Sequence, residues 1–367
     1  MNSLIASIAI VEEDTNDDVS LVWVFPGISE ETRKVLFFFP YEKKKKRAIR
    51  FHDKKKTVQI LIQLSKDSEK FSYTCFKSEW IYMHNESVGS ASSVLPKVKK
   101  FTVAICSKIF NPEKYKHILA MVSGTYRNTG EPTKVLQSVL KLNTTGKLKS
   151  TLSDVKDFSL SSYDDKHARL SGSSLKKVIS CFGEKAILIW LAIILKKRIF
   201  VLADRWTDVL FVVRTIPQFA WLRQDWSVIR PQVRLRSQEQ LNELKQSGVY
   251  VAGTIDTDIS GVTDLFDILV DMKSRKIVVA EGAKSSMAPP SNLSDFATEI
   301  ARKAKDPDCS ETDLIKSIAM KTKEILSGLK KIGGGEKITT EAIRNKGISG
   351  RFAVFLLNFA LAEGLAN

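Results

Sequence analysis

One continuous apolar stretch in the middle of the chain constrains the fold more than any other feature. Residues 186–195 include no polar or charged side chain, a basic triplet KKR follows at 196–198, and a second apolar run covers 199–203. The first run has ten residues, whereas a helix that spans a bilayer needs roughly 20. The pattern therefore predicts a buried helix over 184–195, with cations at the negative end of its dipole. That helix leads directly into a buried strand at 198–203.

The first part of the chain has the pattern of an antiparallel sheet followed by helices. Apolar runs separated by turn-forming residues predict strands at 4–11, 20–25, 57–64, 71–76, 80–83 and 98–107. Asn111 and Pro112 then predict the start of a helix, because Asn is a favoured N-cap and Pro fits the first helical position. A second helix is expected around 134–141. Strands first and helices afterwards indicate a sheet with helices packed on one face.

The second part alternates apolar strands with helices. Helices are expected from Leu175, over 206–215 and over 238–246, the last one ended by Gly248. Near-continuous apolar strands between helices are typical of a largely parallel sheet covered on both faces. Two amphipathic helices follow. One begins near Ser310, and the other carries Phe352, Phe355, Leu356 and Phe359.

These patterns predict an α/β protein that is α+β overall. An antiparallel sheet with helices is expected over 1–145, and a linker rich in Ser, Thr, Asp and Lys over 146–173. An α/β module with a mostly parallel sheet is expected over 174–288, and a helical segment over 289–367.

The chain has no pattern typical of covalent catalysis or metal binding. Its four histidines are scattered and lack the spacing of a zinc site. Neither phosphate-binding glycine motif occurs, GxGxxG or GxxxxGK[ST], and there is no GxSxG nucleophile elbow. The four cysteines are scattered too, mostly beside apolar residues, which is typical of reduced thiols in a cytosolic protein. We expect no catalytic residue, no metal and no cofactor.

A basic patch accounts for much of the net charge of +16. Its candidate residues are Lys43, Lys44, Lys45, Lys46, Arg47, Lys54, Lys55 and Lys56. Such a patch attracts an anionic membrane surface, at about 1 kcal/mol per cation, or another polyanion. Phe51 is the sole aromatic residue among these charges, so the aromatic interleaving that stacks bases is missing and no nucleic acid is expected. The alternative is a solvated loop or an edge strand protected by lysines.

The apolar strand at 20–25 is a candidate protein-binding surface. Alternation along a strand places Leu21, Trp23 and Phe25 on one face. Trp23 and Phe25 are then either part of the core or an exposed aromatic pair that anchors a partner.

The segment WLRQDW at 221–226 is a second candidate. Arg223 and Asp225 stand between the indoles of Trp221 and Trp226. Either both charges are satisfied within the fold at the end of a strand, or Trp221, Arg223 and Asp225 contact a partner.

The order of motifs along the chain resembles the DENN domain family. A hydrophobic helix that ends in a basic turn and begins a core strand resembles the central part of a DENN domain. The other motifs follow the family's order over nearly the whole chain: EEDTNDDVSLVWVFP at 12–26, FNPEKY at 110–115, LKKRI at 195–199, WLRQDW at 221–226, YVAGTID at 250–256 and DLFDILV at 264–270. The specificity of the resemblance lies in their number, spacing and order.

The resemblance implies a longin-like module at the start of the chain and a role in membrane traffic. DENN proteins typically bind Rab GTPases and release GDP, so the implied activity is that of a guanine-nucleotide exchange factor without covalent chemistry. A Rab GTPase is the implied partner, and the cytoplasmic side of late endosomes is the implied location. The alternative is a non-catalytic scaffold subunit of the endosomal Commander assembly, docked on its coiled-coil subunits.

Overall fold

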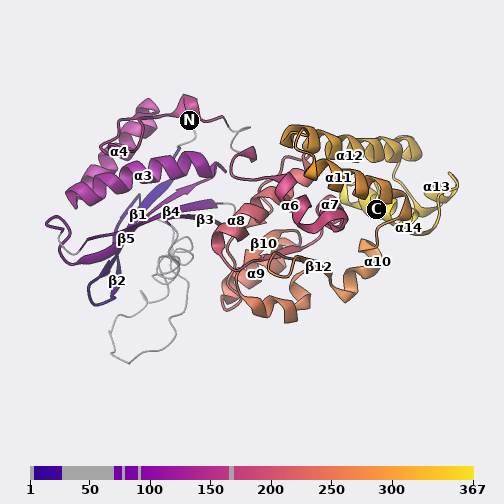
Figure 1. The fold of residues 1–367 in the computed structure, drawn as a ribbon, viewed down its shortest axis with the longest axis horizontal. Helices are drawn as coiled ribbons and strands as arrows, with labels where there is room; N and C mark the ends of the chain where they lie inside the picture. Colours follow the sequence, from indigo (N-terminus) through magenta and orange to yellow (C-terminus); the bar gives the residue numbers. More distant parts are fainter. Residues whose placement is uncertain (1–3, 27–69, 77–78, 90–91, 165–168) are drawn as a thin grey trace. The chain divides into compact units, whose positions relative to one another are not determined.

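The computed structural model describes residues 4–26, 70–76, 79–89, 92–164 and 169–367 (Figure 1). The chain forms two compact units, Met1–Ser171 and Gly172–Asn367. The expected strand at 57–64 and the basic patch at 43–56 lie outside the described residues. Both remain predictions.

The first unit is built on an antiparallel sheet with the strand order β2-β1-β5-β4-β3. Its strands are β1 (Ser7–Asp14), β2 (Val19–Phe25), β3 (Phe71–Phe76), β4 (Glu79–Ser87) and β5 (Val98–Ser107). Helix α3 (Pro112–Thr129) packs on one face, and α4 (Pro132–Thr145) packs on α3 (Figure 1). The ring of Tyr115 in α3 stacks on Tyr82 in β4, with 4.3 Å between centroids. The prediction of an antiparallel sheet with helices is confirmed.

The start of α3 follows the predicted local chemistry. The Asn111 side chain accepts a hydrogen bond from the backbone N–H of Lys114 at 3.1 Å, and Pro112 occupies the first helical turn. Helix α3 ends at Gly130, whose φ of +66° is the left-handed conformation that glycine adopts without steric cost.

Residues 147–162 contain short elements of their own. Strand β6 (Lys147–Leu148) pairs with β7 (Phe158–Ser159), and a 3-10 turn, η1, follows at Leu160–Ser162. Phe158 is buried, with its ring centroid 5.5 Å from that of His117 in α3. This part of the expected linker therefore packs on the helices of the first unit.

The second unit is built on a sheet with the order β12-β11-β8-β10-β9. Strands β8 (Ile199–Leu202), β9 (Ile229–Arg230), β10 (Val251–Thr254) and β11 (Ile268–Asp271) are parallel, and β12 (Lys276–Val279) adds an antiparallel edge. All four residues of the central strand β8 are buried. The predicted module with a mostly parallel sheet is confirmed.

Helices cover both faces of this second sheet (Figure 1). Helix α9 (Gln238–Ser247) lies on one face, where Leu244 joins a core cluster with Phe200 and Ala252. On the other face lie α6 (Leu175–Phe182), α7 (Ile187–Ile194) and α8 (Trp206–Thr215). The helix predicted over 184–195 begins as a 3-10 turn, η2 (Gly183–Ala186), before α7.

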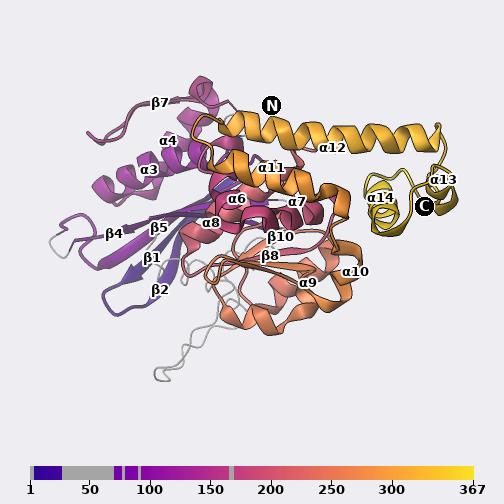
Figure 2. The same ribbon diagram turned by 45° about the vertical axis from the view of Figure 1, so that its right-hand side comes forward.

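Shorter 3-10 elements connect these parts. They are η3 (Ile216–Ala220), η4 (Thr257–Gly261), η5 (Thr263–Leu265), η6 (Glu281–Ala283) and η7 (Ser291–Leu293). The chain then turns helical, with α10 (Lys284–Met287), α11 (Ser294–Lys305), α12 (Glu311–Gly333), α13 (Thr340–Arg344) and α14 (Gly350–Ala362) (Figure 2). Ser310 caps α12 as predicted, by accepting from the N–H of Asp313. Phe355, Leu356 and Phe359 of α14 are buried.

Candidate functional site

The predicted aromatic pair lies on the edge strand of the first sheet. The rings of Trp23 and Phe25 stack with 6.1 Å between centroids and 9° between planes. Trp23 lies opposite Ile10 and Phe25 opposite Ile8, and both isoleucines are fully buried. Phe25 itself is 41% exposed and Trp23 is half-buried. Trp23 and Phe25 therefore extend the buried apolar face of β1 onto the edge strand, where both rings are partly accessible to solvent.

The prediction that Leu21 shares this face was wrong. The register of β1 and β2 shifts between Ile10 and Val11, so that Trp23 opposes Ile10 but Leu21 opposes Val11. Val22 is the extra residue of a β-bulge, and a bulge interrupts the alternation of side chains between the two faces. Leu21 consequently faces the other side of the sheet from Trp23.

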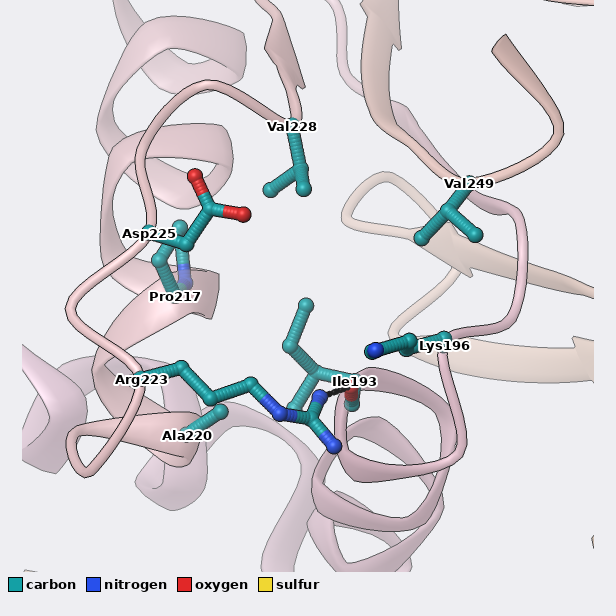
Figure 3. A pocket seen from close by; sticks show the side chains of 8 residues that line it. All are labelled: Ile193, Lys196, Pro217, Ala220, Arg223, Asp225, Val228 and Val249. Atoms are coloured by element: carbon teal, nitrogen blue, oxygen red, sulfur yellow. Dashed lines mark hydrogen bonds between the residues drawn. The ribbon is translucent and has the colours of Figure 1, made fainter. Parts of the chain in front are cut away.

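The second predicted segment borders a small pocket in the second unit. The pocket has a volume of about 140 Å³. It is lined by Ile193, Lys196, Pro217, Ala220, Arg223, Asp225, Val228 and Val249 (Figure 3). Lys196, Val228 and Val249 come just before the parallel strands β8, β9 and β10 respectively. We call this site the amino-edge pocket, because it lies at the amino ends of these strands.

Arg223 is bound within the fold. Its guanidinium donates hydrogen bonds to the carbonyl oxygens of Ile193 at 2.7 Å and Ile194 at 2.5 Å, at the C-terminal end of α7. It also forms an ion pair with Glu363, whose Oε1 accepts from Nε at 3.0 Å. A cation at a helix C-terminus satisfies carbonyl groups that have no partner inside the helix and suits the helix dipole. Arg223 thus joins α7 to the end of α14.

The other residues of the predicted segment are partly engaged. Asp225 Oδ1 accepts hydrogen bonds from the backbone N–H and the hydroxyl of Ser227, at 2.8 and 2.6 Å. Trp226 is buried, and the half-buried indole of Trp221 meets it edge-to-face with 6.0 Å between centroids. Their roles in binding a partner remain predictions.

Lys196 has a backbone conformation that non-glycine residues rarely adopt. Its φ is +52°, and it follows Leu195, the C-cap of α7, at the position where helices usually place glycine. The N–H of Lys197 donates to the Ala192 carbonyl at 2.9 Å, which closes the turn. Gln224, between the pocket residues Arg223 and Asp225, also has a positive φ, +48°. Two of the four described non-glycine residues with positive φ therefore border this pocket.

Sequence reasoning identified Arg223 and Asp225 but did not connect them with Lys196, Pro217 or Val249. The sequence pattern explains the basic triplet at 196–198 by the helix dipole alone. One signal could have found this site: the basic turn, the segment after η3 and Val249, two residues before β10, all precede strands of one parallel sheet, and such positions meet at one edge.

The described residues contain no group of three or more His, Cys, Asp and Glu side chains arranged to hold a metal ion. In the same part of the chain, no helix has both the length and the apolar character needed to cross a membrane.

Comparison with known proteins identifies the family. Residues 172–281, which contain the whole amino-edge pocket, match the family described as Stabilization of polarity axis (SPA). DENN domain-containing protein 10 of Dictyostelium discoideum is 32% identical, over 99% of this chain and 98% of its own length. The chain belongs to the DENN domain-containing protein 10 family. The DENN domain-containing protein 10 sequences of Danio rerio and Homo sapiens are 32% and 30% identical to this chain, and the alignments cover 98% and 96% of their lengths. The predicted DENN resemblance is confirmed, and it extends to both units.

Proposed function

We propose that this DENN-family protein binds a Rab GTPase at late endosomes and promotes release of its guanine nucleotide. The observation that carries the proposal is the match to DENN domain-containing protein 10 over nearly the whole chain. Nucleotide release by this route is a linkage effect. A surface that binds the nucleotide-free GTPase more tightly than the loaded one weakens nucleotide binding by the same coupling free energy.

The test is release of a fluorescent GDP analogue from a panel of purified Rab GTPases. One Rab should lose its nucleotide faster as the concentration of the full chain rises. A panel in which no rate changes, at concentrations well above those at which the chain binds a Rab, contradicts the exchange activity.

A second candidate function is a scaffold role in the endosomal Commander assembly, by docking on its coiled-coil heterodimer. The accessible Trp23–Phe25 pair on the edge strand β2 favours it. Large aromatic side chains, Trp and Tyr above all, are enriched among the residues that carry most of the binding energy of protein interfaces. As a scaffold subunit, the chain would contribute a binding surface and would not promote nucleotide release.

The aromatic pair gives the scaffold role a direct prediction. Phe25→Ala should weaken capture of the purified coiled-coil heterodimer by at least tenfold, because an anchor ring contributes about 1.4 kcal/mol or more. The melting temperature should change little, since Phe25 is 41% exposed. Val278→Ala, at a similarly exposed valine on β12, is the control. Unchanged capture by the Phe25 variant removes this surface from the proposal.

A further inference from the structure

We propose that the amino-edge pocket receives one apolar side chain from a partner protein, and that Lys196 pairs with an acidic residue beside that side chain. The inference rests on the proposed function in one respect, namely that the chain works by binding other proteins. It adds a second contact region, in the α/β unit, to the aromatic pair of the first unit.

The size of the pocket selects its occupant. Pockets for small-molecule ligands and cofactors occupy about 300–1,000 Å³, whereas this one has a volume of about 140 Å³. An apolar cavity of roughly 150 Å³ accommodates benzene. A single Leu, Ile, Met or Phe side chain therefore fits, and a nucleotide does not.

The lining is chemically suited to such a side chain. Ile193, Pro217, Ala220, Val228 and Val249 present apolar atoms to the pocket, as Figure 3 shows for each of them. The polar atoms of Arg223 are directed to Glu363 and to the carbonyl groups of α7, so they are already satisfied. Burial of one apolar side chain here would strengthen binding by about ten- to hundredfold.

Lys196 supplies the charge that specifies the partner. Its side chain is exposed and extends over the pocket in Figure 3. It has no ion-pair partner among the residues that the structure describes. The other acidic or basic groups of the lining, Asp225 and Arg223, are hydrogen-bonded within the fold. The cation that remains available favours a carboxylate on the incoming segment.

The backbone at Lys196 supports a role for this side chain. The left-handed conformation at φ +52° is one that glycine adopts freely and lysine does not. Strained conformations of this kind cluster at functional sites. Lysine at this position has a less favourable backbone conformation than glycine would have. The same conformation places its ammonium group at the mouth of an apolar pocket.

The conformation makes a discriminating variant available. Lys196→Gly removes the ammonium group at a position where glycine is the preferred residue, so the fold should be retained or gain stability. Val249→Trp fills the pocket, and Val354→Trp makes the same change at an exposed valine of α14 outside the pocket. Lys196→Glu reverses the charge.

The first measurement is calorimetric titration of the full chain with the purified coiled-coil heterodimer and with each nucleotide-free Rab. For the protein that binds wild type, Lys196→Gly and Val249→Trp should each raise Kd by about tenfold, and Val354→Trp should leave it unchanged. Lys196→Glu should raise Kd further, because it places two carboxylates together. Wild-type affinity in both Lys196→Gly and Val249→Trp overturns the proposal, and equal losses in the Gly and Glu variants overturn its acidic pairing.

The second measurement does not depend on the partner. Toluene is titrated into the full chain while the methyl signals of Ile193, Val228 and Val249 are followed by NMR. These signals should shift in wild type and in Val354→Trp, and the Ile193 and Val228 signals should not shift in Val249→Trp. If none of the candidate proteins binds the wild-type chain, the proposed function fails, while toluene still decides whether the pocket admits an apolar group. Signals that stay unmoved in wild type overturn the inference.

Discussion

At the scale of single residues, His84 illustrates how burial sets a charge state. Its imidazole lies in the interior of the first unit, in the same row across the sheet as Val103, Ile10 and Trp23. Burial lowers the pKa of His84 to about 4, and the positive charges of Lys70, Arg127 and Lys116 add to this. The ring is therefore neutral at pH 7. Its Nδ1 lies 3.7 Å from Glu86 Oε1, but this contact is not an ion pair at that pH.

We predict that acid weakens the first unit through His84. The pKa in the folded state is below the value of 6.5 that applies to the unfolded chain. The unfolded state therefore binds more protons between pH 6.5 and 4, and stability falls as the pH falls through this window. About 2 kcal/mol should be lost by pH 5. Denaturant unfolding of wild type and His84→Gln at pH 7 and 5 checks this, and an equal pH dependence in both proteins contradicts it.

Arg223 carries the second prediction at this scale. Arg223→Met keeps most of the side-chain volume but removes the donors to the carbonyl groups of α7 and the partner of Glu363. Loss of these charged hydrogen bonds should lower the free energy of unfolding by about 1.5–3 kcal/mol. Asp225→Asn provides the comparison, since its Oδ1 can still accept from Ser227, and it should change stability little. A fully stable Arg223 variant would mean that these bonds add nothing to the fold.

At the scale of elements, the sequence predicted the helices and strands that depend on local residue patterns. The two apolar runs at 186–195 and 199–203, separated by the basic triplet, predicted α7 and β8, and the Asn111–Pro112 pair predicted the start of α3. The bulge at Val22 was not predictable, because it depends on how β2 pairs with β1. The amino-edge pocket was not predictable either. Its residues, from 193 to 249, come together only when the parallel strands align at one edge.

Gly253 shows how closely elements approach one another in the second unit. A Cβ atom built on this residue of β10 would lie 2.3 Å from Val209 Cγ1 in α8 and 2.8 Å from the Pro231 carbonyl oxygen. A backbone atom cannot move aside as a flexible side chain can. Gly253→Ala should therefore cost about 3 kcal/mol, at the upper end of the usual range for overpacking. Gly282→Ala, where no atom lies within 4 Å, should be nearly neutral in the same thermal melt. Similar melting temperatures for both variants would contradict this close packing.

At the scale of the whole molecule, the two units have separate cores. The first is centred on Tyr82, Ile105 and Tyr115, and the second on Phe200, Tyr250 and their neighbours. A unit with its own hydrophobic core can unfold as one cooperative structure. The match to Stabilization of polarity axis begins at residue 172, where the second unit begins.

This organisation predicts that residues 172–367 fold when expressed alone. It also predicts that their stability changes little between pH 7 and 5. His84 belongs to the first unit. In the second, the pKa of Asp267 is lowered because hydrogen bonds from Arg198 outweigh the effect of burial, and the pKa of Asp313 is lowered by Ser310. Carboxyl groups with a lowered pKa stabilise the fold above the unfolded value of 3.8 and lose this effect only as the pH falls below it.

The melting temperature of residues 172–367 should therefore stay nearly constant between pH 7 and 5. Calorimetry of the full chain should show a matching transition, and a second one that falls by about 4–8 °C over the same range, as expected for a loss of about 2 kcal/mol in a unit of this size. The second transition should stop moving in His84→Gln. Failure of residues 172–367 to unfold cooperatively, or equal shifts of both transitions with pH, would mean that the two units depend on each other for their stability.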